Sequence, residues 1–199
     1  MFRNLINRMI PAGLRGWPDE DQPLVAIDVE TTGLDPNTAE LLSIGAVPVV
    51  DRRILLSDRF EAMLRHEGPT HEGSVRIHRL RAVDLESGLP PAEALERFLD
   101  WLDGRPIIGY CVDFDRAALN RALRGSGLQR LDSAAYDVRE MHRRRRKDHV
   151  EDPGHVFDLD AILADLGIPP LARHTAIGDA VATALAYLAL RYGRGKDGS

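Results

Sequence analysis

The sequence predicts an α/β fold built as one domain, with a mixed five-stranded sheet flanked by helices. First, three apolar segments follow one another closely in the first third of the chain, as antiparallel neighbours do. Second, helical and strand patterns then alternate towards the C-terminus, which indicates an α/β domain with a mixed sheet. Third, the chain has 199 residues, of which 44% are hydrophobic and 29% charged, the balance of a single globular domain.

The strands are predicted from apolar runs that end at turn-forming residues. We expect five strands, at residues 24–30, 41–50, 54–63, 106–109 and 134–138. Residues 31–37 have turn chemistry, and the polar residues 51–53 join the second strand to the third. Because these connections are short, the first three strands are expected to pair antiparallel.

The helices are predicted where apolar residues recur at helical spacing between capping residues. We expect them at residues 90–103, 113–124, 158–166 and 178–191. Asp113 is expected to cap the second helix, because it precedes the residues of the buried stripe. The last helix is apolar almost all round and should therefore be buried on more than one face.

The main domain is expected to span residues 23–192. In the segment before it, residues 1–22, apolar residues recur at helical spacing over residues 1–10. This predicts a short amphipathic helix that docks on the domain or on a partner, followed by a linker. Residues 193–199 are expected to form a flexible tail.

The composition excludes several classes of protein. No run approaches the roughly 20 consecutive apolar residues of a membrane span, so no membrane association is expected. The single cysteine, Cys111, cannot form an internal disulfide, which favours a reducing, cytoplasmic location. With 26 Lys and Arg against 31 Asp and Glu, the net charge is −5. This charge argues against attachment to nucleic acid by bulk positive charge, but it is compatible with an acidic site completed by metal ions.

Two carboxylates break the apolar pattern of the first strand. Side chains alternate between the two faces of a strand, so Asp28 and Glu30 point to the same face at its end. A solvated strand end would explain them. However, the strand has the pattern of a central one, and adjacent carboxylates in such a place are often kept because they bind a cation such as Mg²⁺ or Mn²⁺. On spacing alone, a metal site and a solvated face are equally good interpretations.

Two further acidic positions lie at the starts of helices. Asp115 falls in the first turn of the second predicted helix, where it is either a partner of the helix dipole or a further metal ligand. Asp179 falls near the start of the last helix, five residues after His174. Each of these residues singly is explained as a cap or a surface polar group. Taken with the pair on the first strand, a purely structural explanation needs three coincidences.

The order and spacing of these residues resemble a known family of nucleases. The first motif of the DEDD exonucleases resembles Asp28 to Leu34, and the second resembles Gly109 to Asp115. The third motif of the branch that uses histidine, called DEDDh or DnaQ-like, is similar to His174 with Asp179. That branch includes the proofreading epsilon subunit of bacterial DNA polymerase III, ribonuclease T and oligoribonuclease. The match covers residues 24–190, and the fold that it implies is RNase H-like.

The resemblance implies a 3′→5′ exonuclease that hydrolyses phosphodiester bonds with two divalent ions, Mg²⁺ or Mn²⁺, and releases nucleoside 5′-monophosphates. It gives His174 the role of general base. The metal ligands that it implies are Asp28, Glu30, Asp115 and Asp179.

The resemblance also indicates where the substrate binds. The turn that would receive the 3′-terminal nucleotide, with its leucine packed on the base, consists of Thr31, Thr32, Gly33 and Leu34. His78 resembles a further element that meets the substrate, and a surface histidine is the competing interpretation. Tyr110 and Cys111 stand where many relatives have His-Asn, so a polar contact made by that asparagine is not expected here.

The expected partner is a single-stranded 3′ end of DNA or RNA, with DNA proofreading or repair favoured. An RNA-trimming enzyme like oligoribonuclease and an inactive nucleic-acid-binding subunit are the alternatives. The helix at residues 1–10 is expected to contact a polymerase or another protein. The sequence has five consecutive basic residues, Arg143 to Lys147, just after a predicted short helix. They are expected to form either a solvated loop or a clamp for the phosphate backbone.

Overall fold

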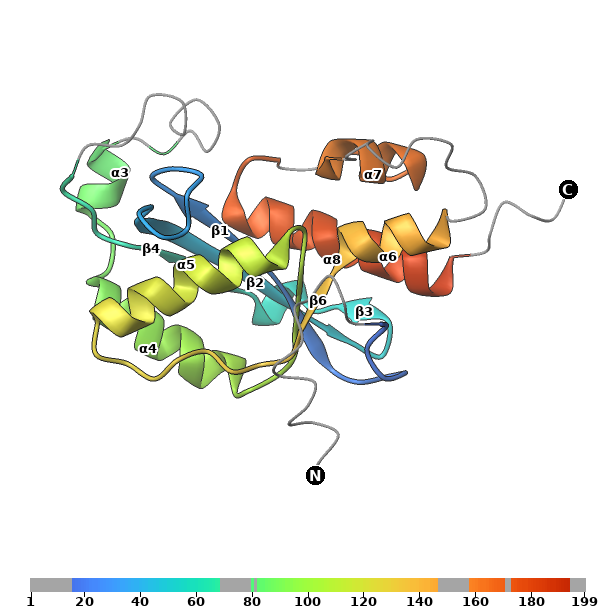
Figure 1. Ribbon diagram of the computed structural model, residues 1–199, viewed down its shortest axis with the longest axis horizontal. Helices are drawn as coiled ribbons and strands as arrows, with labels where there is room; N and C mark the ends of the chain where they lie inside the picture. Colours follow the sequence, from blue (N-terminus) through green and yellow to red (C-terminus); the bar gives the residue numbers. More distant parts are fainter. Residues whose placement is uncertain (1–15, 69–79, 81, 147–157, 171–172, 194–199) are drawn as a thin grey trace, which may run out of the picture.

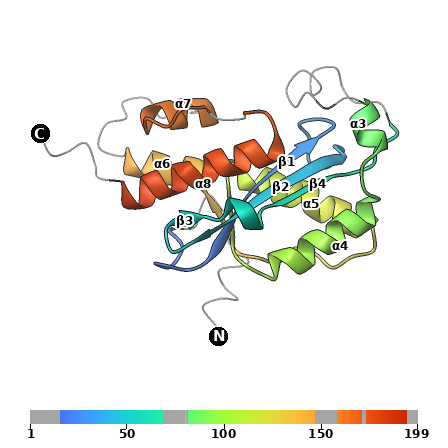
Figure 2. The same cartoon turned by 180° about the vertical axis from the view of Figure 1, so that it is seen from behind.

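The computed structural model describes residues 16–68, 80, 82–146, 158–170 and 173–193. In this part of the chain, a six-stranded mixed sheet lies between two groups of helices (Figures 1 and 2). The predicted α/β fold is therefore confirmed. The helix predicted for residues 1–10 and the tail beyond residue 193 lie outside the described residues, so the expected domain limits stay predictions.

The sheet is built around β1 (Leu24–Thr31). On one side, β2 (Leu41–Val50) pairs antiparallel with almost the whole length of β1. On the other side, β5 (Ile107–Gly109) runs parallel to β1, and β6 (Ala135–Asp137) runs parallel to β5. The short β5 leaves the last residues of β1 without a strand partner on that side, which opens this edge of the sheet to side chains from helices.

The single strand predicted for residues 54–63 is wrong. This segment forms two short strands, β3 (Arg53–Ile54) and β4 (Phe60–Met63), which both pair with β2 and are separated by a 3-10 turn at Leu56–Asp58. Between the two pairings the segment advances six residues, from 54 to 60, whereas β2 advances only three, from 49 to 46. The surplus residues must leave the ladder, and the turn accommodates them.

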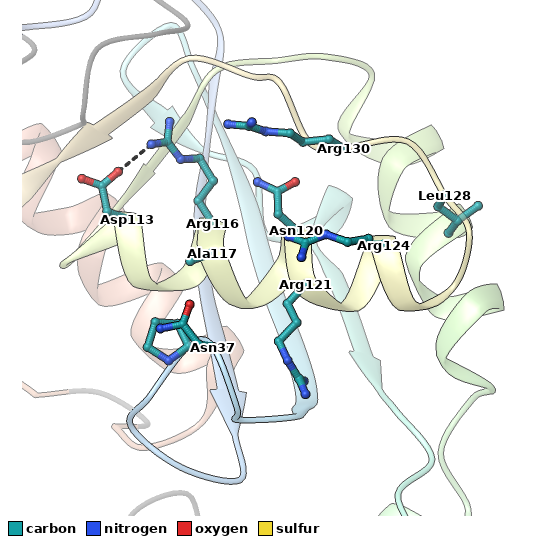
Figure 3. A pocket seen from close by; sticks show the side chains of 10 residues that line it. Asn37, Asp113, Arg116, Ala117, Asn120, Arg121, Arg124, Leu128 and Arg130 are labelled. Atoms are coloured by element: carbon teal, nitrogen blue, oxygen red, sulfur yellow. Dashed lines mark hydrogen bonds and ion pairs between the residues drawn. The ribbon is translucent and has the colours of Figure 1, made fainter.

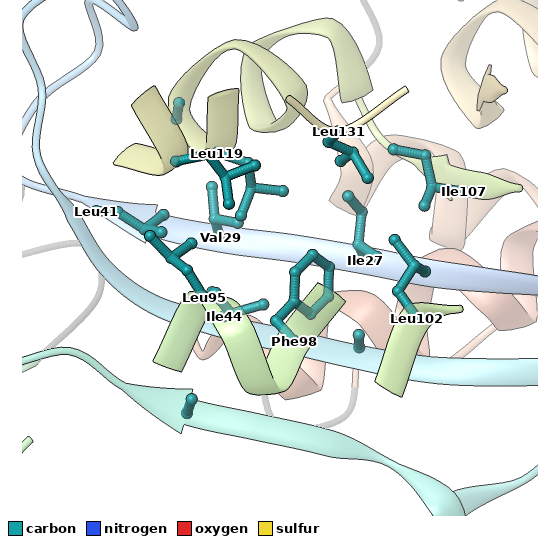
Figure 4. Close-up of a cluster of buried hydrophobic side chains, with 14 of the residues drawn as sticks. Ile27, Val29, Leu41, Ile44, Leu95, Phe98, Leu102, Ile107, Leu119 and Leu131 are labelled. Atoms are coloured by element: carbon teal, nitrogen blue, oxygen red, sulfur yellow. The ribbon is translucent and has the colours of Figure 1, made fainter. Parts of the chain in front are cut away.

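One face of β1 forms the larger part of the core. Because side chains alternate along the strand, Val25, Ile27 and Val29 all point to this face. There they pack against α4 (Pro91–Leu102) and α5 (Val112–Gly125), and Figure 4 shows Ile27 and Val29 within this cluster.

The opposite face of β1 is covered by α8 (Ala176–Tyr192). Small residues of both elements, Ala26 on the strand and Ala180 on the helix, lie in the same buried cluster. α6 (Val138–Arg145) lies beside α8, and α7 (Leu159–Asp165) packs on the side of α8 away from the sheet (Figure 1). The prediction that the last helix is buried on more than one face is confirmed.

The four predicted helices correspond to α4, α5, α7 and α8, and each end lies within two residues of its predicted position. The short helix α3 (Ala82–Glu86) was not predicted. None of the helices in the described part of the chain has the length and apolarity needed to cross a membrane.

Candidate active site

Three carboxylates meet where the end of β1 faces the start of α8. Asp28 and Glu30 lie on the face of β1 that α8 covers, and the first turn of α8 places Asp179 beside them. Carboxylate oxygens of the three residues lie within 4.8 Å of one another. Each side chain is half-buried. Such a set offers hard oxygen ligands to a divalent cation, so these residues fit the metal that the sequence predicts.

The close approach of α8 to the sheet depends on a glycine in β2. Gly45 is the strand partner of Asp28. A Cβ atom on Gly45 would lie 2.2 Å from backbone atoms of Ala176 and Ile177, in the first turn of α8. A larger residue would therefore push the start of α8 away and carry Asp179 with it. Sequence analysis did not identify this residue, although a lone glycine in an apolar strand is a signal of close backbone approach.

Asp115 reaches the site from the other side of β1. It lies in the first turn of α5 and is buried, with 4% of its surface exposed. Its Oδ1 accepts a hydrogen bond from the backbone N–H of Val29 at 3.1 Å, so it serves the part of β1 that the short β5 leaves unpaired. Asp115 is outside the group within 4.8 Å but close enough for its charge to act on Asp28.

The predicted capping role of Asp113 is wrong. α5 begins one residue earlier, and its N-cap is Cys111, which has a left-handed backbone (φ 53°) and makes no side-chain capping bond. The backbone N–H of Cys111 instead donates to Asp137 at 3.3 Å. Asp113 lies inside the first turn, where it forms an ion pair with Arg116 at 2.8 Å. The chain enters the helix directly from β5, which leaves no room for a cap at position 113.

The carboxylates hold negative charge that the protein compensates only in part. Burial raises the pKa of Glu30 to about 7, and the nearby charge of Asp179 adds to this effect. Burial also raises the pKa of Asp115 to about 8. The pKa of Asp28 is raised well above its ordinary range, first by burial and then by the charges of the other three carboxylates. A bound cation would lower these raised pKa values, because it favours the ionised form of a carboxylate.

His174 precedes α8 and is tied to Asp179 through its backbone. It has a left-handed backbone (φ 67°), and its N–H donates to Oδ1 of Asp179 at 3.2 Å. The next residue, Thr175, caps α8 by accepting the N–H of Gly178 at 3.1 Å. The capping turn therefore places the predicted base and a predicted ligand next to each other.

Arg173 is a residue of the site that sequence analysis missed. Its side chain, 13% exposed, forms ion pairs with Asp179 and with Asp160 of α7, the latter at 2.6 Å. Its positive charge lowers the pKa of both Asp28 and Glu30. The guanidinium thus supplies part of the positive charge that the carboxylates require. A single arginine in a loop carries no pattern, so only the fold reveals its position.

The turn predicted to receive a nucleotide is ordered by hydrogen bonds. The hydroxyl of Thr31 donates to the carbonyl of Gly33 at 2.6 Å, and the hydroxyl of Thr32 accepts the N–H of Glu40 at 2.9 Å. Both threonines are buried, whereas Leu34 is 83% exposed. A rigid turn that presents one apolar side chain to solvent is suited to contact a base. His78, the other predicted contact, lies outside the described residues.

The expected arginine loop is wrong, because α6 includes the first three of the five cations. Arg143 and Arg144 pair with Glu140, and Arg146 pairs with Asp165. Arg145 donates to the carbonyls of Ala189, Leu190 and Gly193 at the C-terminal end of α8, the opposite end from Asp179. These ion pairs and hydrogen bonds argue against a phosphate clamp near the carboxylates. Lys147 lies outside the described residues.

Comparison with known proteins identifies an exonuclease domain. The RNase_T family model, described as an exonuclease, matches residues 25–187. A DNA polymerase III subunit epsilon-like protein of Rhodobacter capsulatus is 29% identical over 199 residues, which cover 94% of this chain and 26% of that protein. DNA polymerase III PolC-type of Thermotoga petrophila is 28% identical over 174 residues, which cover 85% of this chain and 12% of that protein. The chain thus spans about a quarter or less of these relatives.

The fold has clear counterparts among solved structures. Exonuclease I of E. coli in complex with a dT13 oligonucleotide superimposes with a TM-score of 0.70 at 19% identity, covering 85% of this chain and 41% of that chain. The likeness confirms the RNase H-like arrangement of sheet and helices.

Proposed function

Because the chain belongs to the RNase_T family of exonucleases, in its DEDDh or DnaQ-like branch, we propose that it removes nucleotides from the 3′ end of DNA. The observation that carries the proposal is the convergence of Asp28, Glu30 and Asp179 within 4.8 Å at the junction of β1 and α8. Asp179 lies about 150 residues after the pair on β1, and burying like charges together is unfavourable without a ligand. The products would be nucleoside 5′-monophosphates.

The carboxylates would hold two divalent cations, and Mg²⁺ or Mn²⁺ suits their hard oxygen atoms best. The ligands in this proposal are Asp28, Glu30, Asp115 and Asp179. The bound ions would supply charge stabilisation at the attacking and leaving oxygens of the phosphodiester. Asp115 has one oxygen committed to the backbone of β1, which orients the other.

His174 would act as general base for the attacking water. Imidazole is the side chain suited to proton transfer near neutral pH. The position of His174 on the turn before α8 places it at the edge of the carboxylate group. In this arrangement the turn from Thr31 to Leu34 would bind the terminal nucleotide, with the exposed Leu34 against its base.

The comparisons favour DNA over RNA as the substrate. The curated relatives include a protein named as similar to the epsilon subunit and several PolC-type DNA polymerases, and exonuclease I was solved with deoxyoligonucleotides. These relatives also favour a polymerase as partner. The segment predicted to contact it, residues 1–10, is outside the described residues, so this contact and the cytoplasmic location stay predictions.

The test is hydrolysis of matched 5′-labelled single-stranded DNA and RNA with Mg²⁺, Mn²⁺ or EDTA. We expect a ladder that shortens from the 3′ end, requires metal and develops faster on DNA. Asp28→Asn should abolish the ladder because a ligand is lost, while Asp100→Asn, an exposed substitution on α4, should not. His174→Ala should slow hydrolysis by about 10²–10⁴.

Each part of the proposal has its own contrary result. A faster ladder on RNA would reassign the substrate to RNA. Full activity of the Asp28→Asn variant would remove the assignment of the site. If no ladder forms with either metal, the exonuclease proposal is rejected in favour of an inactive nucleic-acid-binding module.

A further inference from the structure

An arginine-lined groove of about 450 Å³ runs along α5, outside the carboxylate site. Figure 3 shows its lining, which comes from α5, from the segment after α5 and from the loop that follows β1. The lining contains one acid, Asp113, against four arginines, Arg116, Arg121, Arg124 and Arg130. The local charge is therefore positive, although the whole chain has a net charge of −5.

Two of these arginines are available to an external anion. Arg124 and Arg130 are exposed, and neither forms an ion pair with a carboxylate in the described part of the chain. Arg116 pairs with Asp113, and a guanidinium of Arg121 donates to the carbonyl of Ala39 at 3.0 Å. The groove thus has two arginines that bond to its walls and two that have no carboxylate partner among the described residues.

The groove begins next to the proposed active site. Asp113 lines one end of it and lies two residues before Asp115, whose carboxylate bonds to β1. Asn37 lines the same end and belongs to the loop that continues the turn ending at Leu34. The first turn of α5 and the loop after β1 therefore contribute residues both to the groove and to the proposed active site.

The length of the groove along α5 suits a chain of phosphates. Arg116 and Arg124 are eight residues apart on one helix, which corresponds to a rise of about 12 Å. At about 3.4 Å per nucleotide of a stacked strand, that distance spans roughly three to four nucleotides. The groove is therefore long enough for an extended polyanion. The guanidinium groups of Arg124 and Arg130 can bind its phosphates through paired N–H donors.

We propose that this groove binds the sugar-phosphate backbone of the substrate strand, upstream of its 3′-terminal nucleotide. The identification of that strand rests on the proposed exonuclease function, whereas binding of a polyanion by the groove does not. Arg124 and Arg130 neutralise phosphates there. Arg116 and Arg121 bond to Asp113 and to the carbonyl of Ala39 in the walls of the groove.

The test compares the affinity of the full-length protein for a fluorescein-labelled oligodeoxythymidylate of about twelve nucleotides across a salt titration. EDTA prevents hydrolysis. The double variant Arg124→Gln/Arg130→Gln should bind roughly tenfold more weakly, and its salt slope should fall by about 1.4, for two lost contacts to a single strand. The matched control, Arg97→Gln/Arg143→Gln, removes two exposed charges elsewhere and should leave both quantities unchanged.

Turnover separates this proposal from the proposed activity. The double variant should hydrolyse a dinucleotide at the wild-type rate, because Arg124 lies about 14 Å along α5 from Asp115. Unchanged affinity and slope in the double variant, or equal weakening in the control, would overturn the groove proposal. If the wild-type protein hydrolyses nothing but the double variant still binds more weakly than the wild type, the groove proposal is supported and the exonuclease activity is rejected.

Discussion

Two groups of like charge lie near opposite ends of α8. Arg143 to Arg146 crowd positive charge at its C-terminal end, and each of them contacts an acidic side chain or a backbone carbonyl. Asp28, Glu30 and Asp179 crowd negative charge at its N-terminal end, where Arg173 pairs with Asp179 and lowers the pKa of the other two. The first group is nearly compensated within the protein, and the second is not.

The difference indicates which charged groups stabilise the fold and which are available to bind a ligand. Compensated charge ties α6 to α7 and α8, so its removal should weaken the fold. Uncompensated charge costs stability in the absence of a ligand and provides affinity when one arrives. Arg124 and Arg130 in the groove along α5 carry uncompensated charge, although they are arginines like the compensated residues on α6.

The largest effect on stability is expected from Arg145→Ala. The guanidinium donates hydrogen bonds to three carbonyls at the C-terminal end of α8, where its positive charge also interacts favourably with the helix dipole. Its loss should lower the free energy of unfolding by about 1–2 kcal/mol, or about 2–8 °C in Tm. Thermal unfolding measures this change, with Arg97→Ala as an exposed control. An equal change in both variants would contradict the structural role of the arginines on α6.

The stability of the metal-free protein should depend on pH through the carboxylates. The pKa of Glu30 is raised to about 7 and that of Asp115 to about 8, so between about pH 4.5 and 8 the folded state binds more protons than the unfolded state. Unfolding free energy must then fall as pH rises across this range. We expect Tm in EDTA to drop by several degrees, and Mn²⁺ to restore it increasingly as pH rises.

The control for this pH dependence is Asp28→Asn, which removes one charge from the group. It should flatten the profile in EDTA and stabilise the metal-free protein at pH 8 relative to the wild type. A wild-type Tm that rises towards pH 8 more steeply than that of the variant would contradict the raised pKa values.

The smallest effect is expected from Arg173→Gln on metal affinity. Arg173 pairs with Asp179 and competes with a divalent cation for the same charge. Its removal should tighten Mn²⁺ binding a few-fold, measured by titration calorimetry of the full chain. Arg146→Gln, which breaks an ion pair with Asp165, is the matched control and should not change the affinity. Weaker binding after Arg173→Gln would mean that the arginine supports the ligands instead of opposing the cation.

Local patterns in the sequence were sufficient for much of the fold and for the main acidic residues. The period of two in β1 placed Asp28 and Glu30 on one face, and the helical periods located α4, α5, α7 and α8 within two residues. Such patterns are local because side-chain direction follows from the backbone repeat alone. The catalytic and metal-binding roles, which the family resemblance implies, stay predictions.

Other features became visible only in the folded chain. The split of the third strand depends on how many residues β2 offers as partners, and the space for α8 depends on the missing side chain of Gly45. The run beginning at Arg143 was predicted to form a solvated loop or a phosphate clamp, yet Arg143 to Arg146 make contacts within the fold. The dispersed Arg116, Arg124 and Arg130, in contrast, meet in one groove. The sequence by itself determined which charges this protein has and which face of each element carries them. Only the tertiary structure decided which charges found partners, because compensation depends on distance in space, which adjacency along the chain does not specify.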